Sequence, residues 1–282
     1  MSQRFLVILA GLMVVVAACS SSGGAPATVT PTSSPTTVAA PSPTPVPVEL
    51  TIFAAASLKG ALADVKVAYE AANPGMTLTI STDSSAALKT QIEQGAPADV
   101  FLSADTKNPQ ALVDAGLTDG AAVDFAGNKL VVIVPTDNPA AVKTPADLAT
   151  PGLKVIAAGD EVPITTYANQ LINNLAREPG YPAAFVAAYQ ANIVSKEDNV
   201  KAVVAKLELG EGDAAIVYVT DAKISTDVAS VEVPDSANVI ATYAGVVVKT
   251  TESPGPAAAF LSWLAGPEGQ AILSGFGFLP RS

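Results

Sequence analysis

Hydroxyl-bearing residues stand at two points of this sequence where an apolar strand pattern gives way to a helical pattern. Ser57 follows a predicted strand at residues 50–53, and a polar run at residues 81–85 follows another at residues 77–80. Hydroxyl groups and the unpaired N–H groups of a helix start can together hold an anion. An ordinary N-cap role fits such serines equally well. Each loop alone is weak evidence, but both point toward the same end of a sheet, where open α/β folds bind ligands.

Two later loops also precede helical patterns. In residues 159–165, Pro163 suits the first turn of a helix, and a plain turn is the alternative. In residues 195–200, either Asp198 or Asn199 is expected to cap the helix that follows. These loops therefore add two more helix starts to the candidate anion site.

A tyrosine ends a strongly apolar strand pattern at residues 215–218. A tyrosine in this setting, here Tyr218, is usually a core residue whose hydroxyl finds any available partner. On residue chemistry alone, these features indicate an α/β binding protein and go no further.

The residues that the chain lacks exclude several kinds of chemistry. It has no His, the commonest general base and metal ligand, and Cys19 is its only Cys. We therefore expect no catalytic residue, no cofactor and no metal bound directly by side chains. An anchored serine hydrolase using Ser57 or Ser85 would need a Lys as its base. Lys59 and Lys89 are near in sequence, but not at the Ser-x-x-Lys spacing.

The first 47 residues are expected to direct and tether the protein. A short basic start, an apolar run at residues 5–16 and two small residues before Cys19 resemble a lipoprotein signal peptide spanning residues 1–18. Cys19 would then be lipidated, and residues 19–47, rich in Pro, Ser and Thr, would form a tether. An ordinary signal peptide with an accidental Cys is the alternative. We expect an extracytoplasmic protein anchored to the membrane.

The charge of the chain limits its partners. The formal net charge is −11, which leaves no basic footprint for nucleic acid. An anion must therefore be bound by local groups, without help from the overall field of the protein.

Short apolar strands alternate with amphipathic helices along the body, which predicts an α/β fold. Strands are expected at residues 50–53, 77–80, 99–102, 129–134, 154–157, 214–219 and 239–248. Helices are expected at residues 58–71, 86–94, 165–177, 185–190, 200–209, 256–264 and 268–275. We expect one lobe from residues 48–127 and 238–282, and a second from residues 128–237, joined near Asn128 and Asn238.

Five short motifs carry a resemblance to a known family. They are FAAASL at residues 53–58, QIEQGAPADVFLSA at residues 91–104, GNKLVV at residues 127–132, AIVYVTDA at residues 215–222 and GFGF at residues 275–278. Over essentially all of residues 48–282, the chain resembles the molybdate-binding component of ABC transporters.

The resemblance implies a type II periplasmic-binding fold, with two α/β lobes and a two-strand hinge. It implies that the ligand is molybdate or tungstate, with another oxyanion such as sulfate as the alternative. The partners would be an ABC transporter permease and its ATPase, and the protein a monomer. Motif by motif, the anion would receive hydrogen bonds from hydroxyls of Ser57, Ser85 and Tyr218 and from backbone N–H groups at Ile164 and Val200.

Two departures from the family pattern concern the shape of the pocket. Ile164 and Thr165 stand where the family often has a small residue and Gly. Asp83 places an acid beside the serine-rich loop, in which Ser84 is an alternative ligand to Ser85. The chemistry is still adequate, because each hydrogen bond to a charged group contributes about 1.5–3 kcal/mol.

Overall fold

The computed structural model describes residues 47–281, which lie in one compact unit spanning Thr44–Ser282. Cys19, the expected signal peptide and nearly all of the expected tether lie outside the described residues, so these assignments stay predictions. Within the described part, every helix is too short or too polar to cross a bilayer.

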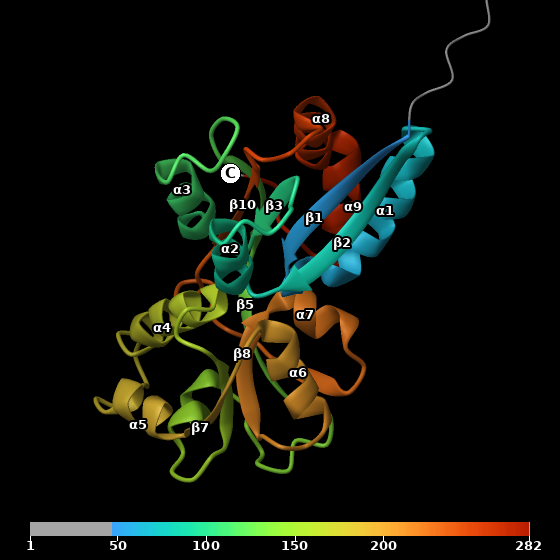
Figure 1. The fold of residues 1–282 in the computed structure, drawn as a ribbon. Helices are drawn as coiled ribbons and strands as arrows, with labels where there is room; N and C mark the ends of the chain where they lie inside the picture. Colours follow the sequence, from blue (N-terminus) through green and yellow to red (C-terminus); the bar gives the residue numbers. More distant parts are fainter. Residues whose placement is uncertain (1–46, 282) are drawn as a thin grey trace, which may run out of the picture. The chain divides into compact units, whose positions relative to one another are not determined.

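Two five-stranded sheets form the framework of the body (Figure 1). The first contains β1 (Val48–Ala55), β2 (Met76–Asp83), β3 (Val100–Ser103), β4 (Val123–Asn128) and β10 (Ala241–Val247). The second contains β5 (Leu130–Pro135), β6 (Val155–Ala158), β7 (Ile193–Glu197), β8 (Ala214–Tyr218) and β9 (Val228–Val231). We call the first sheet with its helices lobe 1, and the second sheet with its helices lobe 2.

The two sheets share one strand arrangement. Their orders are β2-β1-β3-β10-β4 and β7-β6-β8-β5-β9. In each sheet the first three strands are mutually parallel, and the fourth runs antiparallel to both of its neighbours. Each fourth strand is the one that the chain enters directly after crossing from the other lobe. The predicted two-lobed α/β fold is confirmed.

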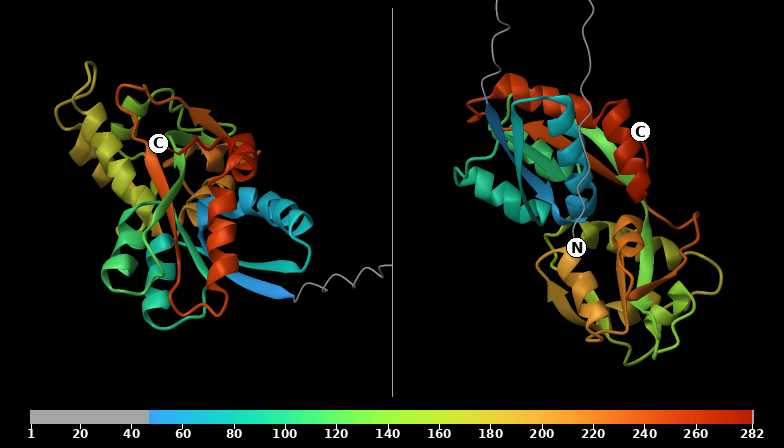
Figure 2. Two further views of the ribbon diagram at one scale, coloured as in Figure 1. Left: turned by 90° about the horizontal axis from the view of Figure 1, so that it is seen from above. Right: turned by 90° about the vertical axis from the view of Figure 1, so that its right-hand side faces the viewer.

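Helices flank both sheets (Figures 1 and 2). Lobe 1 carries the short 3-10 turn η1 (Ala56–Leu58), α1 (Lys59–Ala72), α2 (Ser85–Glu93), α3 (Lys107–Asp114), α8 (Pro254–Leu264) and α9 (Pro267–Phe276). Lobe 2 carries η2 (Pro145–Ala149), α4 (Pro163–Leu175), α5 (Phe185–Ala191), α6 (Val200–Glu208) and α7 (Val219–Ile224). Both views of Figure 2 show α9 (red) beside α1 (blue), so the two ends of the body close lobe 1 together.

Burial explains why these segments form these elements. All six residues of β5 are buried, as expected of a strand inside a sheet that is covered on both faces. In α4 the buried positions include Ile164, Ala168, Leu171 and Leu175, which recur at helical spacing and face the core. Such amphipathic patterns allowed most elements to be predicted.

The sequence did not predict α3, β4, β7, α7 and β9, nor the short 3-10 turns η1 and η2. Residues 195–197 were expected in a loop, yet they belong to β7, which lies at the edge of its sheet. An edge strand tolerates polar residues, so it lacks the apolar signal of a central strand. Val219, expected at the end of a strand, instead begins α7.

The chain crosses between the lobes in two adjacent segments. Only Lys129 separates β4 from β5, and residues 232–240 lead from β9 back to β10. The side-chain amide of Asn238 ties the crossings together: its Nδ2 donates to the Leu130 carbonyl at 2.9 Å, and its Oδ1 accepts from the Leu130 N–H at 3.1 Å.

Candidate functional site

A small cavity, with a volume of about 10 Å³, lies between lobe 1 and lobe 2. Lobe 1 lines it with Ala55, Ala56, Ser57, Ser84, Ser85 and Ala104, and lobe 2 with Val162, Pro163, Ile164, Asn199, Val200 and Tyr218. All five positions predicted to bind an anion are among them, so the fold brings the predicted donors together. None of these twelve described residues carries a charge.

The strand arrangement explains the convergence. Ser57 follows β1 and Ser85 follows β2, which are parallel neighbours. Ile164 and Val200 follow β6 and β7, and Tyr218 is the last residue of β8; these three strands are also parallel neighbours. Carboxyl ends of parallel strands meet at one edge of a sheet. Two such edges therefore supply the walls of the cavity.

Ser57 is not a helix cap. It lies inside η1, and its side chain makes no capping hydrogen bond to η1 or α1. Its buried Oγ lies 2.8 Å from the hydroxyl oxygen of Tyr243, on β10. The N-cap alternative is wrong for this residue, because its oxygen is engaged by another side chain.

Ser84 and Ser85 have different roles. Ser84 caps α2, since its Oγ accepts the N–H of Ala87 at 3.2 Å. Ser85, at the first helical position, accepts the buried N–H of Ala104 at 3.0 Å. That bond occupies a lone pair of Ser85 and leaves its proton free to donate. Ser85 therefore stays the predicted ligand.

Two helix starts present backbone N–H groups. Pro163 has no N–H, so the first donor of α4 is Ile164. In α6, Asn199 is the cap that the sequence left open, because its Oδ1 accepts the N–H of Ala202 at 3.1 Å. Val200 then begins α6 with an N–H that has no acceptor inside the helix. Both starts carry the partial positive charge of a helix N-terminus.

Tyr218 brings an unpaired hydroxyl to the cavity. Its side chain is 1% exposed, and its hydroxyl oxygen has no hydrogen-bond partner among the described residues. Edge-to-face contacts with Tyr167 and Tyr243, at centroid distances of 6.5 and 5.7 Å, hold its ring. Burial raises the pKa of Tyr218 well above its usual value, so the hydroxyl keeps its proton. An unsatisfied buried group costs about 1–3 kcal/mol, and an acceptor in the cavity would remove that cost.

Comparison with known proteins matches this architecture to a family. Residues 50–279 match the family described as bacterial extracellular solute-binding protein. The chain belongs to this family. It is 34% identical to the molybdate-binding protein ModA of Mycobacterium tuberculosis over 230 residues. The alignment covers 81% of this chain and 84% of that protein.

Two solved structures place this solute-binding protein among two-lobed relatives. The periplasmic molybdate-binding protein of Azotobacter vinelandii has a TM-score of 0.69 and 26% identity, covering 83% of this chain and all (100%) of that one. The sulfate-binding protein SubI of Mycobacterium tuberculosis has a TM-score of 0.73 at 22% identity, covering 83% of this chain and 87% of that one. The second likeness concerns the fold alone.

In this solute-binding protein, Asp83 is turned away from the cavity. Its Oδ1 accepts the N–H of Ser84 at 2.7 Å and the side-chain amide of Asn199 at 3.1 Å. Asp83 lines a wider groove outside the cavity rather than the cavity itself. The acid that departs from the family pattern therefore joins lobe 1 to lobe 2.

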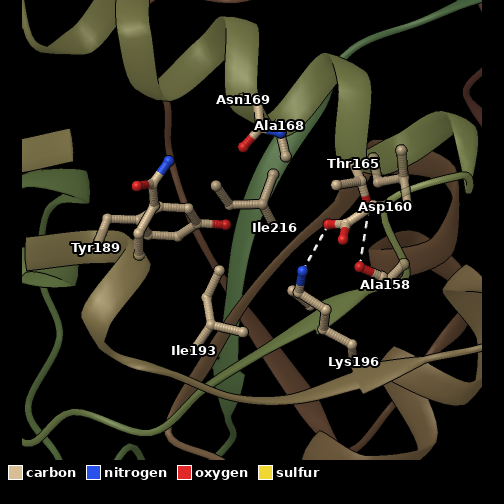
Figure 3. Close-up of a pocket in the computed structure, with 12 residues that line it drawn as sticks. Ala158, Asp160, Thr165, Ala168, Asn169, Tyr189, Ile193, Lys196 and Ile216 are labelled. Atoms are coloured by element: carbon tan, nitrogen blue, oxygen red, sulfur yellow. Dashed lines mark hydrogen bonds and ion pairs between the residues drawn. The ribbon is translucent and has the colours of Figure 1, made fainter. Parts of the chain in front are cut away.

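The second departure from the family pattern is the pair Ile164 and Thr165 at the start of α4, and both residues line a cavity other than the one between the lobes. Figure 3 shows a separate cavity within lobe 2, lined by residues of α4, α5 and the neighbouring strands. Thr165 faces it, and its hydroxyl donates to the carbonyls of Ala158 at 3.0 Å and Gly159 at 2.8 Å. Ile164 lines both cavities. The hydroxyl of Thr165 thus fixes the loop before α4 and does not enter the cleft.

Sequence reasoning missed the residues that support the donors from behind. Tyr243 contacts Ser57, and Ala104 contacts Ser85, across 186 and 19 positions of the chain. Tyr243 reads as one more core residue in an apolar strand, so no local signal marked it. Asn128, which was expected near the hinge, lies within 3.4 Å of the Tyr243 hydroxyl.

Proposed function

We propose that this protein captures molybdate, or tungstate, in the cavity between its lobes and delivers it to an ABC importer made of a permease and an ATPase. The donors to the anion are the hydroxyls and backbone N–H groups that line the cavity: Ser57, Ser85, Tyr218, Ile164 and Val200.

The observation that carries this proposal is the unpaired hydroxyl of Tyr218. It is a protonated donor, buried in a cavity without charged side chains, opposite two serines that can also donate. Donors that converge without an acceptor fit a ligand that supplies acceptors only. A tetrahedral oxyanion without protons is such a ligand, and the kinship with molybdate-binding relatives supports molybdate.

A neutral site suits a dianion in an acidic protein. Lys201, next to Val200, is the cation nearest in sequence to a proposed donor, but its Nζ lies 2.8 Å from Oδ1 of the buried Asp221. Burial raises the pKa of Asp221, and Lys201 opposes that rise. The ammonium group is thus committed to an internal carboxylate. Hydrogen bonds from neutral donors must then hold the anion, each contributing about 1.5–3 kcal/mol.

The donor set also predicts which anions are rejected. Phosphate near neutral pH carries a P–OH that needs an acceptor, and a donor facing a donor costs about 1–3 kcal/mol. Sulfate has no proton but is smaller than molybdate, so it reaches fewer donors at once. We expect tight binding of molybdate and tungstate, weak binding of sulfate and poor binding of phosphate.

Thermal unfolding with each anion tests this function. A ligand at 100 times its dissociation constant stabilises the folded state by about 2.7 kcal/mol, which raises Tm by roughly 5–11 °C in a protein of this size. Molybdate and tungstate should give shifts of this order, sulfate a small one and phosphate none. Equal stabilisation by phosphate and molybdate would contradict the proposal.

We further propose that the protein is a monomer, anchored outside the cytoplasm by lipid on Cys19. The family is extracellular, and the small residues before the single Cys of the chain support the anchor. Cys19→Ser should release the protein from the membrane fraction or leave it unprocessed. Unchanged membrane attachment of this variant would argue against the anchor.

We propose no enzymatic activity. The serine hydroxyls contact Tyr243 and the backbone of Ala104, and Lys89 forms an ion pair with Glu93 at 3.0 Å. These contacts offer the serines no base. A serine-reactive probe should leave the protein unlabelled, and labelling of a cavity serine would point to a hydrolase instead.

A further inference from the structure

Ser57 and Ser85, the two lobe 1 serines proposed as donors, both form hydrogen bonds with other groups of the protein. Ser85 accepts a backbone N–H, a bond with only one possible direction. Ser57 instead lies 2.8 Å from the hydroxyl of Tyr243, and either hydroxyl of such a pair can donate. The direction of that bond decides whether Ser57 offers the cavity a proton or a lone pair.

Asn128 sets the direction. Its Nδ2 donates to the hydroxyl of Thr220 at 2.8 Å and approaches the hydroxyl of Tyr243 at 3.4 Å. An amide nitrogen only donates, so the Tyr243 oxygen accepts from it, and among the described residues the Ser57 oxygen is then the acceptor within reach of the Tyr243 proton. All of these side chains are buried, and burial keeps the Tyr243 hydroxyl protonated by raising its pKa well above the usual value.

Tyr243 is itself held firmly in place. The rings of Phe125 and Phe278 contact it edge to face, at centroid distances of 6.1 and 5.3 Å. Gly277, with a φ of 98°, ends α9 in the left-handed region and turns the chain so that Phe278 reaches this position. Tyr243 does not line the cavity, so it acts behind the donor rather than on the ligand.

We propose that Tyr243, oriented by Asn128, is a positioning residue that fixes Ser57 as a hydrogen-bond donor and thereby sets the selectivity for oxyanions without protons. This inference rests on the proposed function. Without the Tyr243 hydroxyl, Ser57 can rotate and accept a proton from its ligand. The site then loses part of its affinity for molybdate and part of its discrimination against hydrogen phosphate.

Calorimetric titration of the full chain with molybdate, sulfate and phosphate tests this role. Tyr243→Phe should weaken molybdate and sulfate binding about tenfold, the effect of one net hydrogen bond. The ratio of the phosphate dissociation constant to the molybdate dissociation constant should fall by at least the same factor. Phosphate at a fixed concentration should also raise the Tm of the variant more than the Tm of the wild type. Tyr69→Phe, a buried tyrosine of lobe 1 that packs on Phe260 and Trp263, is the matched control and should change neither affinity nor selectivity.

Asn128→Asp gives a second, independent test. A carboxylate can only accept, so it should draw the Tyr243 proton toward itself and leave Ser57 donating to Tyr243. Ser57 would then face the cavity with lone pairs. The added negative charge weakens the binding of every anion, so the decisive quantity is the affinity for phosphate relative to the affinity for sulfate. This ratio should shift toward phosphate.

The outcomes separate this inference from the proposed function. If wild-type protein binds molybdate but Tyr243→Phe weakens all three anions equally, or changes nothing, the selectivity role is overturned while the function stands. If Tyr243→Phe does not fold, an unchanged phosphate-to-sulfate preference in Asn128→Asp overturns it. Absence of molybdate binding by the wild type overturns both.

Discussion

The two lobes present their donors in different ways. The hydroxyls of lobe 1, on Ser57 and Ser85, each contact another group of lobe 1, namely Tyr243 or the backbone of Ala104. Lobe 2 offers N–H groups at two helix starts and the hydroxyl of Tyr218, which has no partner among the described residues. Lobe 1 is therefore arranged for the ligand by its own contacts, whereas Tyr218 in lobe 2 gains a partner only when an acceptor enters. Substitutions on the two sides should differ in their effects on stability.

The largest effect is expected on the lobe 1 side. Ser85→Ala removes a donor to the anion and leaves the buried Ala104 N–H unsatisfied. Molybdate affinity should fall about 10- to 100-fold, and the free energy of unfolding without ligand by about 1–3 kcal/mol. Calorimetry and urea unfolding measure the two quantities. Ser81→Ala, at an exposed position near the end of β2, should change neither.

Tyr218→Phe should separate affinity from stability. It removes one donor, so molybdate affinity should also fall about 10- to 100-fold. Because the lost hydroxyl has no partner among residues 47–281, the ligand-free variant should be as stable as the wild type or up to about 1 kcal/mol more stable. Tyr189→Phe, another buried tyrosine of lobe 2, is the control for affinity. A large loss of ligand-free stability in Tyr218→Phe would break the contrast between the lobes.

A smaller effect is expected where the lobes touch. Asn199 caps α6 and donates across the cleft to Asp83. Asn199→Ser keeps an oxygen that can cap α6, but its side chain is too short to reach Asp83. The free energy of unfolding should therefore be nearly unchanged, while molybdate affinity falls about two- to fivefold. Asn199→Ala loses the cap as well and should be about 1 kcal/mol less stable. If both variants lost equal stability, the side chain would not act as a cap.

The smallest effect concerns the groove outside the cavity. Its carboxylates belong to Asp83, Asp105, Asp160, Glu161, Glu197 and Asp198, and its ammonium groups to Lys89, Lys107 and Lys196. An anion approaching this groove is repelled, and salt screens that repulsion over about 8 Å at 0.15 M. The molybdate association rate in stopped-flow fluorescence should therefore rise roughly two- to threefold between low and physiological ionic strength. A rate that falls with salt would instead indicate attraction.

Local signals in the sequence were enough for the framework of the fold, whereas the resemblance to a known family selected the five predicted donors that the fold brings to one cavity. Pro163 before Ile164, and Asn199 before Val200, are patterns typical of helix starts. The supporting contacts were hidden because they join distant segments: Ser57 to Tyr243 over 186 positions, and Asp83 to Asn199 over 116. A single sequence carries no signal for such pairings, since only the packed strands bring them together. For the same reason the polar edge strand β7 was taken for a loop.

The proposed site is tested directly by a crystal structure of residues 44–282, a segment that contains all the described residues, grown with molybdate and measured at the molybdenum absorption edge. We predict one anomalous peak in the cavity, with molybdate oxygens accepting from the hydroxyls of Ser57, Ser85 and Tyr218 and from the N–H groups of Ile164 and Val200. A peak elsewhere on the protein, or one in the cavity with Tyr218 still unpaired, would contradict it.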